Sequence, residues 1–327
     1  MNLEKIPTAD FHVDIFNPKL EKILDSPEFS YATKRANQLP AEGLKKVDLI
    51  FASVYKRLNE GTNAAAPEGS EDIQGPVRED LYKIIEFAKA SENFKIIQKP
   101  EDLELEEAGD QNNILLHLEG GDIITGPEVV DELHKRGIRS IGPLYSHDNQ
   151  LGGGASGDEN KGLTPLGEEV IQRMIERGMI IDVSHANQKT ANDILGQVGQ
   201  YEKTVATHTA FGDKQRFITQ DLMKKISEKG GVVGFTPAKP FFPTLDKYIE
   251  NFKRASDISG SADNMAIGSD FGGLNVEHLY KELDNIGGLS IIAEKLSEQG
   301  NFNDEEIEKI MYGNIAKVVK RINKKTT

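Results

Sequence analysis

Residues 162–187 read GLTPLGEEVIQRMIERGMIIDVSHAN, a helix signal followed directly by a strand signal. Thr164 is of the residue type that caps a helix N-terminus, Pro165 suits the first helical turn, and Gly178 suits the end of a helix. The run that follows, MIIDVSH, is nearly continuous in apolar character, as expected of a parallel strand buried on both faces. The stretch predicts a helix followed by a parallel strand with a histidine at its end.

The same alternation extends along the whole chain. Short apolar runs occur at 11–16, 47–55, 113–120, 140–145, 179–185, 204–208, 231–237 and 264–270. Between them, residues 81–92, 221–231 and 307–322 carry apolar side chains at helical spacing. Eight strands alternating with helices fit either a closed (β/α)8 barrel, the TIM barrel, or an open doubly wound sheet.

Two stretches are predicted to be long loops. Residues 59–77 and 146–162 are rich in Gly, Asn and Asp, and each follows a candidate strand. In a barrel both would lie at the C-terminal rim, where substrate-binding loops belong. The segment 152–157, GGGASG, fits a dinucleotide-binding pattern, but a polar loop and not a helix follows it, which excludes that interpretation.

The positions of polar residues at the strand ends distinguish between the barrel and the open sheet. They are His12 and Asp14 in the first run, Glu119 in the third, His147 after the fourth, His185, His208 and Asp270. The C-terminal ends of barrel strands converge on one cavity, whereas an open sheet would spread these side chains along an edge. We therefore predict a (β/α)8 barrel forming a single catalytic domain over residues 1–327.

These residue types indicate a metal centre. Taken singly, each is more often an ordinary hydrogen-bonded side chain, but their shared position at strand ends argues for ligands. The predicted ligands of two divalent metal ions, most simply Zn²⁺, are His12, Asp14, Glu119, His185 and His208, with Glu119 as the bridge. Two ions about 3.5–4 Å apart would share a nucleophilic hydroxide. Asp270, opposite the ligands, is expected to transfer protons.

Composition restricts the classes of function. The 327 residues are 37% hydrophobic and carry a formal net charge of −14, which argues against binding nucleic acid or anionic membranes. The chain has no cysteine, which excludes disulfides, thiolate metal sites and a cysteine nucleophile. No secretory signal is visible, and no apolar run approaches the roughly 20 residues of a membrane span. We expect a soluble, cytoplasmic enzyme.

Four motifs together resemble one known family, the membrane (renal-type) dipeptidases of peptidase family M19. ADFHVD (9–14) resembles the family's D-G-H-x-D opening, and LHLEGG (116–121) resembles the strand that carries its bridging glutamate. Residues 162–187 resemble its G-L-T-x-x-G…G-M-x-x-D-x-S-H segment, and IGSDFGG (267–273) resembles its G-S-D-F-D-G. The resemblance extends from the first strand to the last helix.

The resemblance implies a zinc-dependent dipeptidase that cleaves the peptide bond of dipeptides through a metal-bridging hydroxide. It implies the same two-metal ligand set, and substrates that include dipeptides with a D-residue at the C-terminal position. By resemblance Asp270 is the acid/base aspartate, and His147 contacts the substrate and the developing oxyanion. Arg216 would hold the terminal carboxylate, which a guanidinium pairs with bidentately. Family habit also implies a homodimer.

Three positions depart from the family pattern. Phe11 replaces a glycine, Gly272 stands where an aspartate is frequent, and Asp122 stands where a histidine is common. None of them is a predicted ligand, so they bear on substrate range. Two alternatives remain: a barrel hydrolase of cyclic amides, lactones or phosphoesters with the same metal pair, and a non-catalytic homologue. Missing ligands would mark the second, and here the set is complete.

Overall fold

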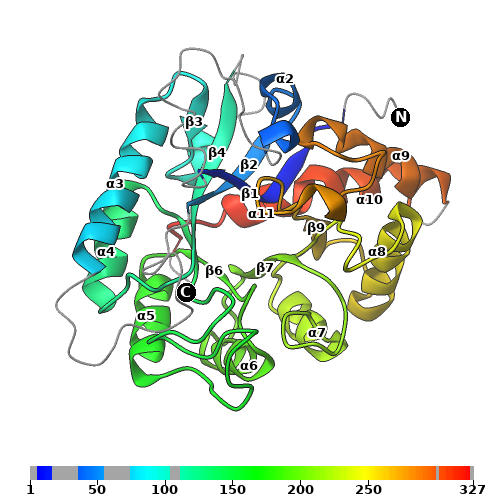
Figure 1. Ribbon diagram of the computed structural model, residues 1–327. Helices are drawn as coiled ribbons and strands as arrows, with labels where there is room; N and C mark the ends of the chain where they lie inside the picture. The colour runs from blue at the N-terminus through cyan, green and yellow to red at the C-terminus, as the bar shows by residue number, and fades with distance from the viewer. Residues whose placement is uncertain (1–5, 17–35, 55–73, 104–110, 300–301, 325–327) are drawn as a thin grey trace.

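The computed structural model describes residues 6–16, 36–54, 74–103, 111–299 and 302–324, and these form a barrel of parallel strands surrounded by helices (Figure 1). The strands are β1 (Ala9–Phe16), β2 (Leu49–Val54), β3 (Phe94–Ile96), β4 (Asn112–Glu119), β5 (Ser140–Gly142), β6 (Ile180–Asp182), β7 (Thr204–Thr209), β8 (Val233–Phe235) and β9 (Met265–Ile267). Their order is β1-β2-β4-β5-β6-β7-β8-β9, and β3 pairs with the start of β4 outside this path. All eight apolar runs of the sequence are strands of this path, which confirms the predicted barrel.

The barrel closes between β1 and the segment that follows β9. The Asp14 amide donates to the Phe271 carbonyl at 2.9 Å, and the Asp270 amide donates to the His12 carbonyl at 3.0 Å. Val13 and Phe271 form a parallel bridge at the same place. The first and last strands are thereby brought together, with Asp270 against β1.

The helices are α2 (Ala41–Leu44), α3 (Gln74–Ala90), α4 (Pro127–Arg136), α5 (Pro165–Glu176), α6 (Gln188–Gln197), α7 (Gln220–Glu228), α8 (Leu245–Ser259), α9 (Ser290–Glu298), α10 (Asp304–Glu308) and α11 (Asn314–Val319). The α5 start is as predicted, because the Thr164 hydroxyl accepts the Gly167 amide and Pro165 is the first helical residue. Gly178 follows the helix with φ of 68°, a left-handed conformation that favours glycine. A π-helical turn, Lys309–Gly313, joins α10 to α11 within the predicted C-terminal helix.

Two sequence expectations need correction. The predicted loop 59–77 is wrong over its last residues, because α3 already begins at Gln74, while residues 59–73 lie outside the described residues. β3 was not expected, since only three half-buried residues form it. The loop 146–162 is confirmed: it contains no helix or strand, and a single bridge joins Gly154 to Ala186.

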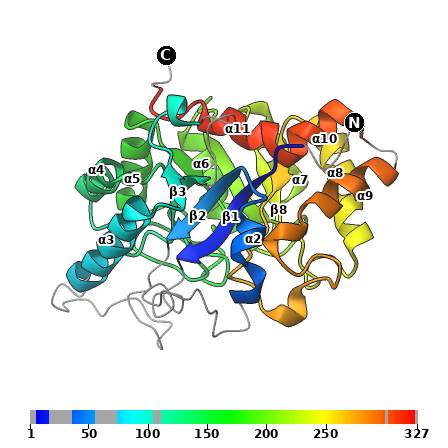
Figure 2. The same cartoon turned by 90° about the horizontal axis from the view of Figure 1, so that it is seen from above.

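The barrel interior is sealed at one end by the C-terminal helix. Figure 2 shows α11 lying across the end at which the strands begin. The buried cluster there combines Phe51, Leu115 and Val205 from the strands with Ile315 and Val318 from α11. Polar chemistry is thereby restricted to the opposite end of the barrel. Among the described residues, no helix is long and apolar enough to cross a membrane.

Candidate metal centre

A polar layer lies inside the barrel directly above an apolar one. The apolar layer contains Phe51, Leu115, Ile180 and Val205, all fully buried. Two residues further along the same strands stand Ser53, His117, Asp182 and Thr207, which are also buried. Alternate residues of a strand face the same side, so this second set also points into the barrel. Glu119 follows His117 by two residues and forms the next layer.

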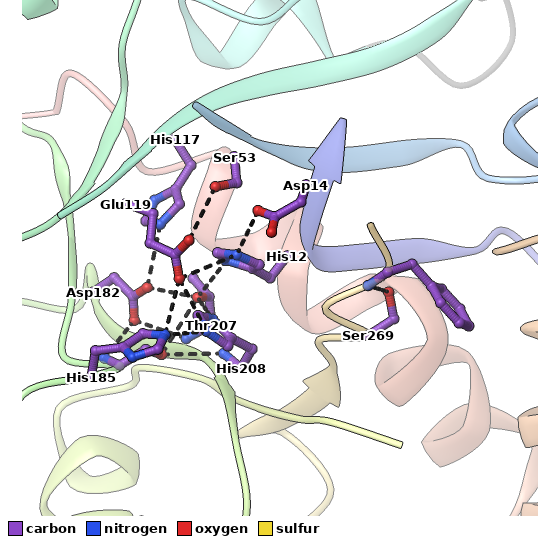
Figure 3. Close-up of polar contacts among 12 residues, drawn as sticks. His12, Asp14, Ser53, His117, Glu119, Asp182, His185, Thr207, His208 and Ser269 are labelled. Carbon is purple, nitrogen blue, oxygen red and sulfur yellow. Dashed lines mark hydrogen bonds and ion pairs between the residues drawn. The ribbon is translucent and has the colours of Figure 1, made fainter. Parts of the chain in front are cut away.

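Glu119 lies at the centre of three histidines (Figure 3). Its Oε1 atom lies 3.0 Å from His185 Nε2, 3.3 Å from His208 Nε2 and 3.6 Å from His12 Nε2. The Nε2 atoms of His185 and His208 are 2.9 Å apart. The other carboxylate oxygen, Oε2, lies 3.5 Å from the Ser53 hydroxyl. Side chains from separate parts of the barrel therefore meet around one carboxylate oxygen.

Two aspartates complete the cluster at the closure of the barrel. Asp14 Oδ1 lies 3.5 Å from His12 Nε2. Carboxylate oxygens of Asp14 and Asp270 and a ring nitrogen of His12 all lie within 4.8 Å of one another. A Cβ atom at Gly273 would lie 2.3 Å from Asp270 Oδ1 and 2.5 Å from Asp14 Oδ2. Glycine is therefore needed at position 273 for both carboxylates to take these places.

The pKa values of this cluster, without metal, are strongly shifted. Burial acts to raise the pKa of Glu119, but the charge of His12 and the close contacts of the three histidines hold it well below its usual range. Burial, with the Asp14 carboxylate next, raises the pKa of Asp270 well above its usual range. Burial, with the Arg216 guanidinium next, lowers the pKa of His185 to about 4. The cluster thus combines one carboxyl group with a lowered pKa, one with a raised pKa and an imidazole with a lowered pKa.

The pKa values of His208 and His12 shift in opposite directions. Burial, followed by the charges of His12 and Arg216, holds the pKa of His208 well below its usual range. Burial acts to lower the pKa of His12 too, but the Glu119 carboxylate outweighs it and the pKa is raised. The pKa values of the two histidines therefore differ because the Glu119 carboxylate acts most strongly on His12.

The donor set fits divalent metal ions. His12 Nε2 and Asp14 Oδ1 are buried and have no hydrogen-bond partner among the described residues. Leaving a buried polar atom unsatisfied costs roughly 1–3 kcal/mol, and a cation among these lone pairs removes that cost. Imidazole and carboxylate donors without sulfur suit zinc, manganese or cobalt. His12, Asp14, Glu119, His185 and His208 could hold such ions.

His185 reaches the cluster through contacts from the rim of the barrel. Its backbone has φ of 64°, in the left-handed region. The Ala155 amide donates to the His185 carbonyl at 2.8 Å, and the Tyr145 ring stacks on the imidazole with centroids 4.6 Å apart. Arg216 Nη2 lies 3.3 Å from His185 Nε2. The rim therefore positions both this histidine and a guanidinium beside it.

Of the residues singled out in the sequence, all but one are brought together. The gathered residues are His12, Asp14, Glu119, His185, His208, Arg216 and Asp270. His147 is half-buried in the 146–162 loop, and among the described residues its side chain forms no hydrogen bond or ion pair with the cluster. Tyr145, two residues earlier, contacts His185 instead.

Sequence reasoning missed five residues at this centre. They are Ser53, His117, Tyr145, Asp182 and Thr207. A search restricted to metal-ligand types at strand ends passes over hydroxyl residues within apolar runs. Two signals were available: His117 precedes Glu119 by one strand period, and Tyr145 ends a run at the place where other runs carry site residues.

Comparison with known proteins identifies relatives of this barrel. A sequence model described as "Membrane dipeptidase (Peptidase family M19)" matches residues 2–327. An uncharacterised protein of Acinetobacter calcoaceticus is 35% identical over 177 residues, which cover 50% of this chain and 55% of that protein. The chain therefore spans only about half the length of that relative.

Solved structures share the fold. A metallopeptidase from Rhodobacter sphaeroides, liganded with a phosphinate mimic of the dipeptide L-Ala-D-Ala, superposes with a TM-score of 0.80 at 21% identity, covering 97% of this chain and 99% of that one. A dipeptidase AC of family M19 superposes with a TM-score of 0.78 at 20% identity, covering 97% and 98%. At these identities the likeness concerns the fold.

Proposed function

The chain belongs to the membrane dipeptidase family, peptidase family M19, and from this premise we propose that it hydrolyses the peptide bond of dipeptides with two bound zinc ions. The observation that carries the proposal is the buried cluster around Glu119 with Arg216 3.3 Å from one of its histidines. A guanidinium beside a metal cluster suits a small substrate with a carboxylate close to its scissile bond.

In this proposal the five donors divide between two ions. His12 and Asp14 would hold one ion, His185 and His208 the other, and Glu119 both. Divalent ions bound there would polarise a carbonyl group and lower the pKa of a water molecule. Substrate binding and proton transfer would be carried out by protein side chains.

Arg216 is proposed to bind the substrate's terminal carboxylate. Its Nη1 atom is buried and has no hydrogen-bond partner among the described residues, so this nitrogen has donors available. Two parallel hydrogen bonds from a guanidinium orient a carboxylate as well as neutralise it. This contact would fix the distance from the C-terminus of the substrate to its peptide bond and so favour dipeptides over longer peptides.

Asp270 is proposed as the acid/base residue. It lies beside Asp14 and His12, and burial with the Asp14 charge raises its pKa well above the usual range. A carboxyl group with a raised pKa can accept a proton during attack and deliver it to the leaving amine. His147, on the rim loop beside Gly154, is proposed to contact the substrate near its carbonyl oxygen.

The proposed substrates include dipeptides with a D-residue at the C-terminal position. The Rhodobacter sphaeroides structure, liganded with a mimic of L-Ala-D-Ala, supports this extension. We also propose a cytoplasmic homodimer, because the absence of cysteine suits a reducing compartment and twofold dimers are the commonest closed assembly.

The test is release of free amino acids from a panel of L-L and L-D dipeptides, before and after chelator treatment. Cleavage that the chelator abolishes and zinc restores is the expected result. A protein that holds two zinc ions but cleaves no dipeptide would remove the substrate assignment and favour another hydrolase on the same barrel. A protein that binds no zinc would remove the metal assignment as well.

A further inference from the structure

Thr207 lies where three buried side chains meet beneath the metal centre (Figure 3). Its hydroxyl oxygen is 2.6 Å from Asp182 Oδ2, 3.0 Å from His208 Nδ1 and 3.3 Å from His12 Nδ1. All four side chains are almost completely buried. One hydroxyl group therefore touches two of the candidate ligands on the side away from Glu119.

The single hydroxyl proton decides the direction of these hydrogen bonds. A carboxylate oxygen 2.6 Å away is the strongest acceptor present, so Thr207 donates to Asp182. The Thr207 oxygen then has only lone pairs to offer, and both Nδ1 atoms must donate to it. With Nδ1 protonated, the neutral ring of His12 and that of His208 each carry their lone pair on Nε2, which faces Glu119.

Asp182 is itself held rigidly. Its Oδ1 atom accepts the Ser184 amide and the Thr207 amide, both at 2.9 Å, so β6 and β7 are joined through this carboxylate. Its Oδ2 atom faces both the Thr207 hydroxyl and His117 Nε2, the latter at 3.5 Å. A fixed carboxylate leaves the threonine hydroxyl with one favourable orientation.

We propose that Thr207, oriented by Asp182, is a positioning residue that fixes the tautomer and ring orientation of His12 and His208 together. The inference rests on the proposed function, in which these two histidines bind different ions, so one hydroxyl couples the two metal sites. His185 lacks this support, because its Nδ1 atom has no hydrogen-bond partner among the described residues. Removing partners of this kind typically weakens metal binding roughly 10–100-fold.

The first test compares Thr207→Val with Thr207→Ser. Valine keeps the shape without the hydroxyl, and serine keeps the hydroxyl. Zinc affinity is measured by competition with a chromogenic chelator. We expect the valine variant to lose roughly 10–100-fold affinity at both sites, and the serine variant to bind within a few-fold of wild type. Thr204→Val is the matched control, since it removes a buried hydroxyl from the same strand that, among the described residues, hydrogen-bonds to the Tyr201 carbonyl and not to the cluster.

Asp182→Asn tests the direction of the hydrogen bonds and serves also if the valine variant does not fold. The amide NH₂ would donate to Thr207, whose own proton would then turn toward a histidine Nδ1. That histidine would have to place its proton on Nε2, where it blocks the metal. We expect zinc affinity to fall although the side chain keeps its size.

A spectroscopic readout separates positioning from packing. In zinc-loaded protein with ¹⁵N-labelled histidine, His12 and His208 should give Nδ1–H signals protected from exchange, and Thr207→Val should lose that protection. Unchanged zinc affinity and unchanged signals in Thr207→Val, or a wild-type protein that binds no zinc, would overturn the inference. Neither readout uses a dipeptide, so a protein with the expected zinc behaviour but no dipeptidase activity would contradict the proposed substrate alone.

Discussion

His185 and Asp270 both have backbone angles that L-residues seldom adopt. Their φ values are 64° and 59°, and each follows a barrel strand, β6 or β9. A residue other than glycine in this region costs of order 1–3 kcal/mol, so surrounding contacts must hold it there. At His185 the Ala155 amide and the Tyr145 ring supply such contacts. Both side chains lie in the cluster, His185 against Glu119 and Asp270 beside Asp14 and His12.

This backbone conformation makes Asp270→Asn a clean test of proton transfer. Asparagine tolerates positive φ as well as aspartate does, and it keeps the side-chain shape. We expect the variant to bind the same number of zinc ions as wild type. Its kcat should fall by at least about 100-fold, because general acid–base catalysis contributes factors of about 10²–10⁴. Metal analysis and steady-state kinetics on the same sample provide the check. Loss of zinc, or near-normal turnover, would contradict the role given to Asp270.

Arg216→Ala tests recognition of the carboxylate. A hydrogen bond to a charged group contributes about 1.5–3 kcal/mol, so KM for dipeptides should rise roughly 10–100-fold. The matched comparison uses dipeptide amides, which lack the carboxylate. The wild-type protein should have a high KM for these amides, and Arg216→Ala should raise that KM little further. An equal loss on both substrate types would mean that Arg216 acts on the centre itself, through its contact with His185.

At the scale of elements, two aspartates join neighbouring strands in the same way. Asp10 Oδ1 accepts the amide of His12 and that of Ser269, and Asp182 Oδ1 accepts the amides of Ser184 and Thr207. Each carboxylate accepts the amide two residues ahead and a second amide from the neighbouring part of the barrel, which is in β7 for Asp182 and just after β9 for Asp10. Both therefore fix strand ends where the candidate metal ligands lie, one at the closure of the barrel and one beneath His208.

The rim loop 146–162 depends on the start of α5. The Thr164 hydroxyl accepts the Gly167 amide at 3.0 Å and donates to the Gln150 carbonyl at 2.6 Å. In α7 the Thr219 hydroxyl accepts the Leu222 amide, and within the described part of the chain it makes no second hydrogen bond. Thr164→Ala should therefore lower the free energy of unfolding by more than the roughly 1 kcal/mol expected of Thr219→Ala. Urea unfolding of both variants decides this, and equal losses would mean that the loop contact contributes nothing.

The sequence predicted elements where burial imposes a pattern. Strands buried on both faces are largely apolar, so all eight barrel strands could be recognised, whereas β3 is too short to show a period. The start of α3 was missed because residues 74–77 continue a stretch of loop-like composition. Thr207 and Ser53 were missed for another reason: their role depends on neighbours from other strands, which a single sequence does not place.

For the whole molecule, metal should be a large contributor to stability. The cluster gathers buried lone pairs on side chains from β1, β4 and β7 and from the segment after β6, so the unfolded chain cannot reproduce it. At free zinc about 1,000-fold above Kd, linkage gives about 4 kcal/mol per site. The melting temperature should fall on chelation and rise again with added zinc in a concentration-dependent way. A melting temperature that is insensitive to zinc would mean that the centre binds no metal strongly.

The packing of α11 against one end of the barrel has a consequence for substrate entry and product release. Among the described residues α11 covers the end at which the strands begin, so in the proposed reaction the released amino acids would leave at the same end of the barrel at which the dipeptide enters. In the proposed reaction a bound product, particularly one with its carboxylate on Arg216, would block binding of the next dipeptide. At high product concentration the free amino acid that carries the C-terminal carboxylate would occupy the free enzyme and act as a competitive inhibitor, raising the apparent KM and leaving kcat unchanged.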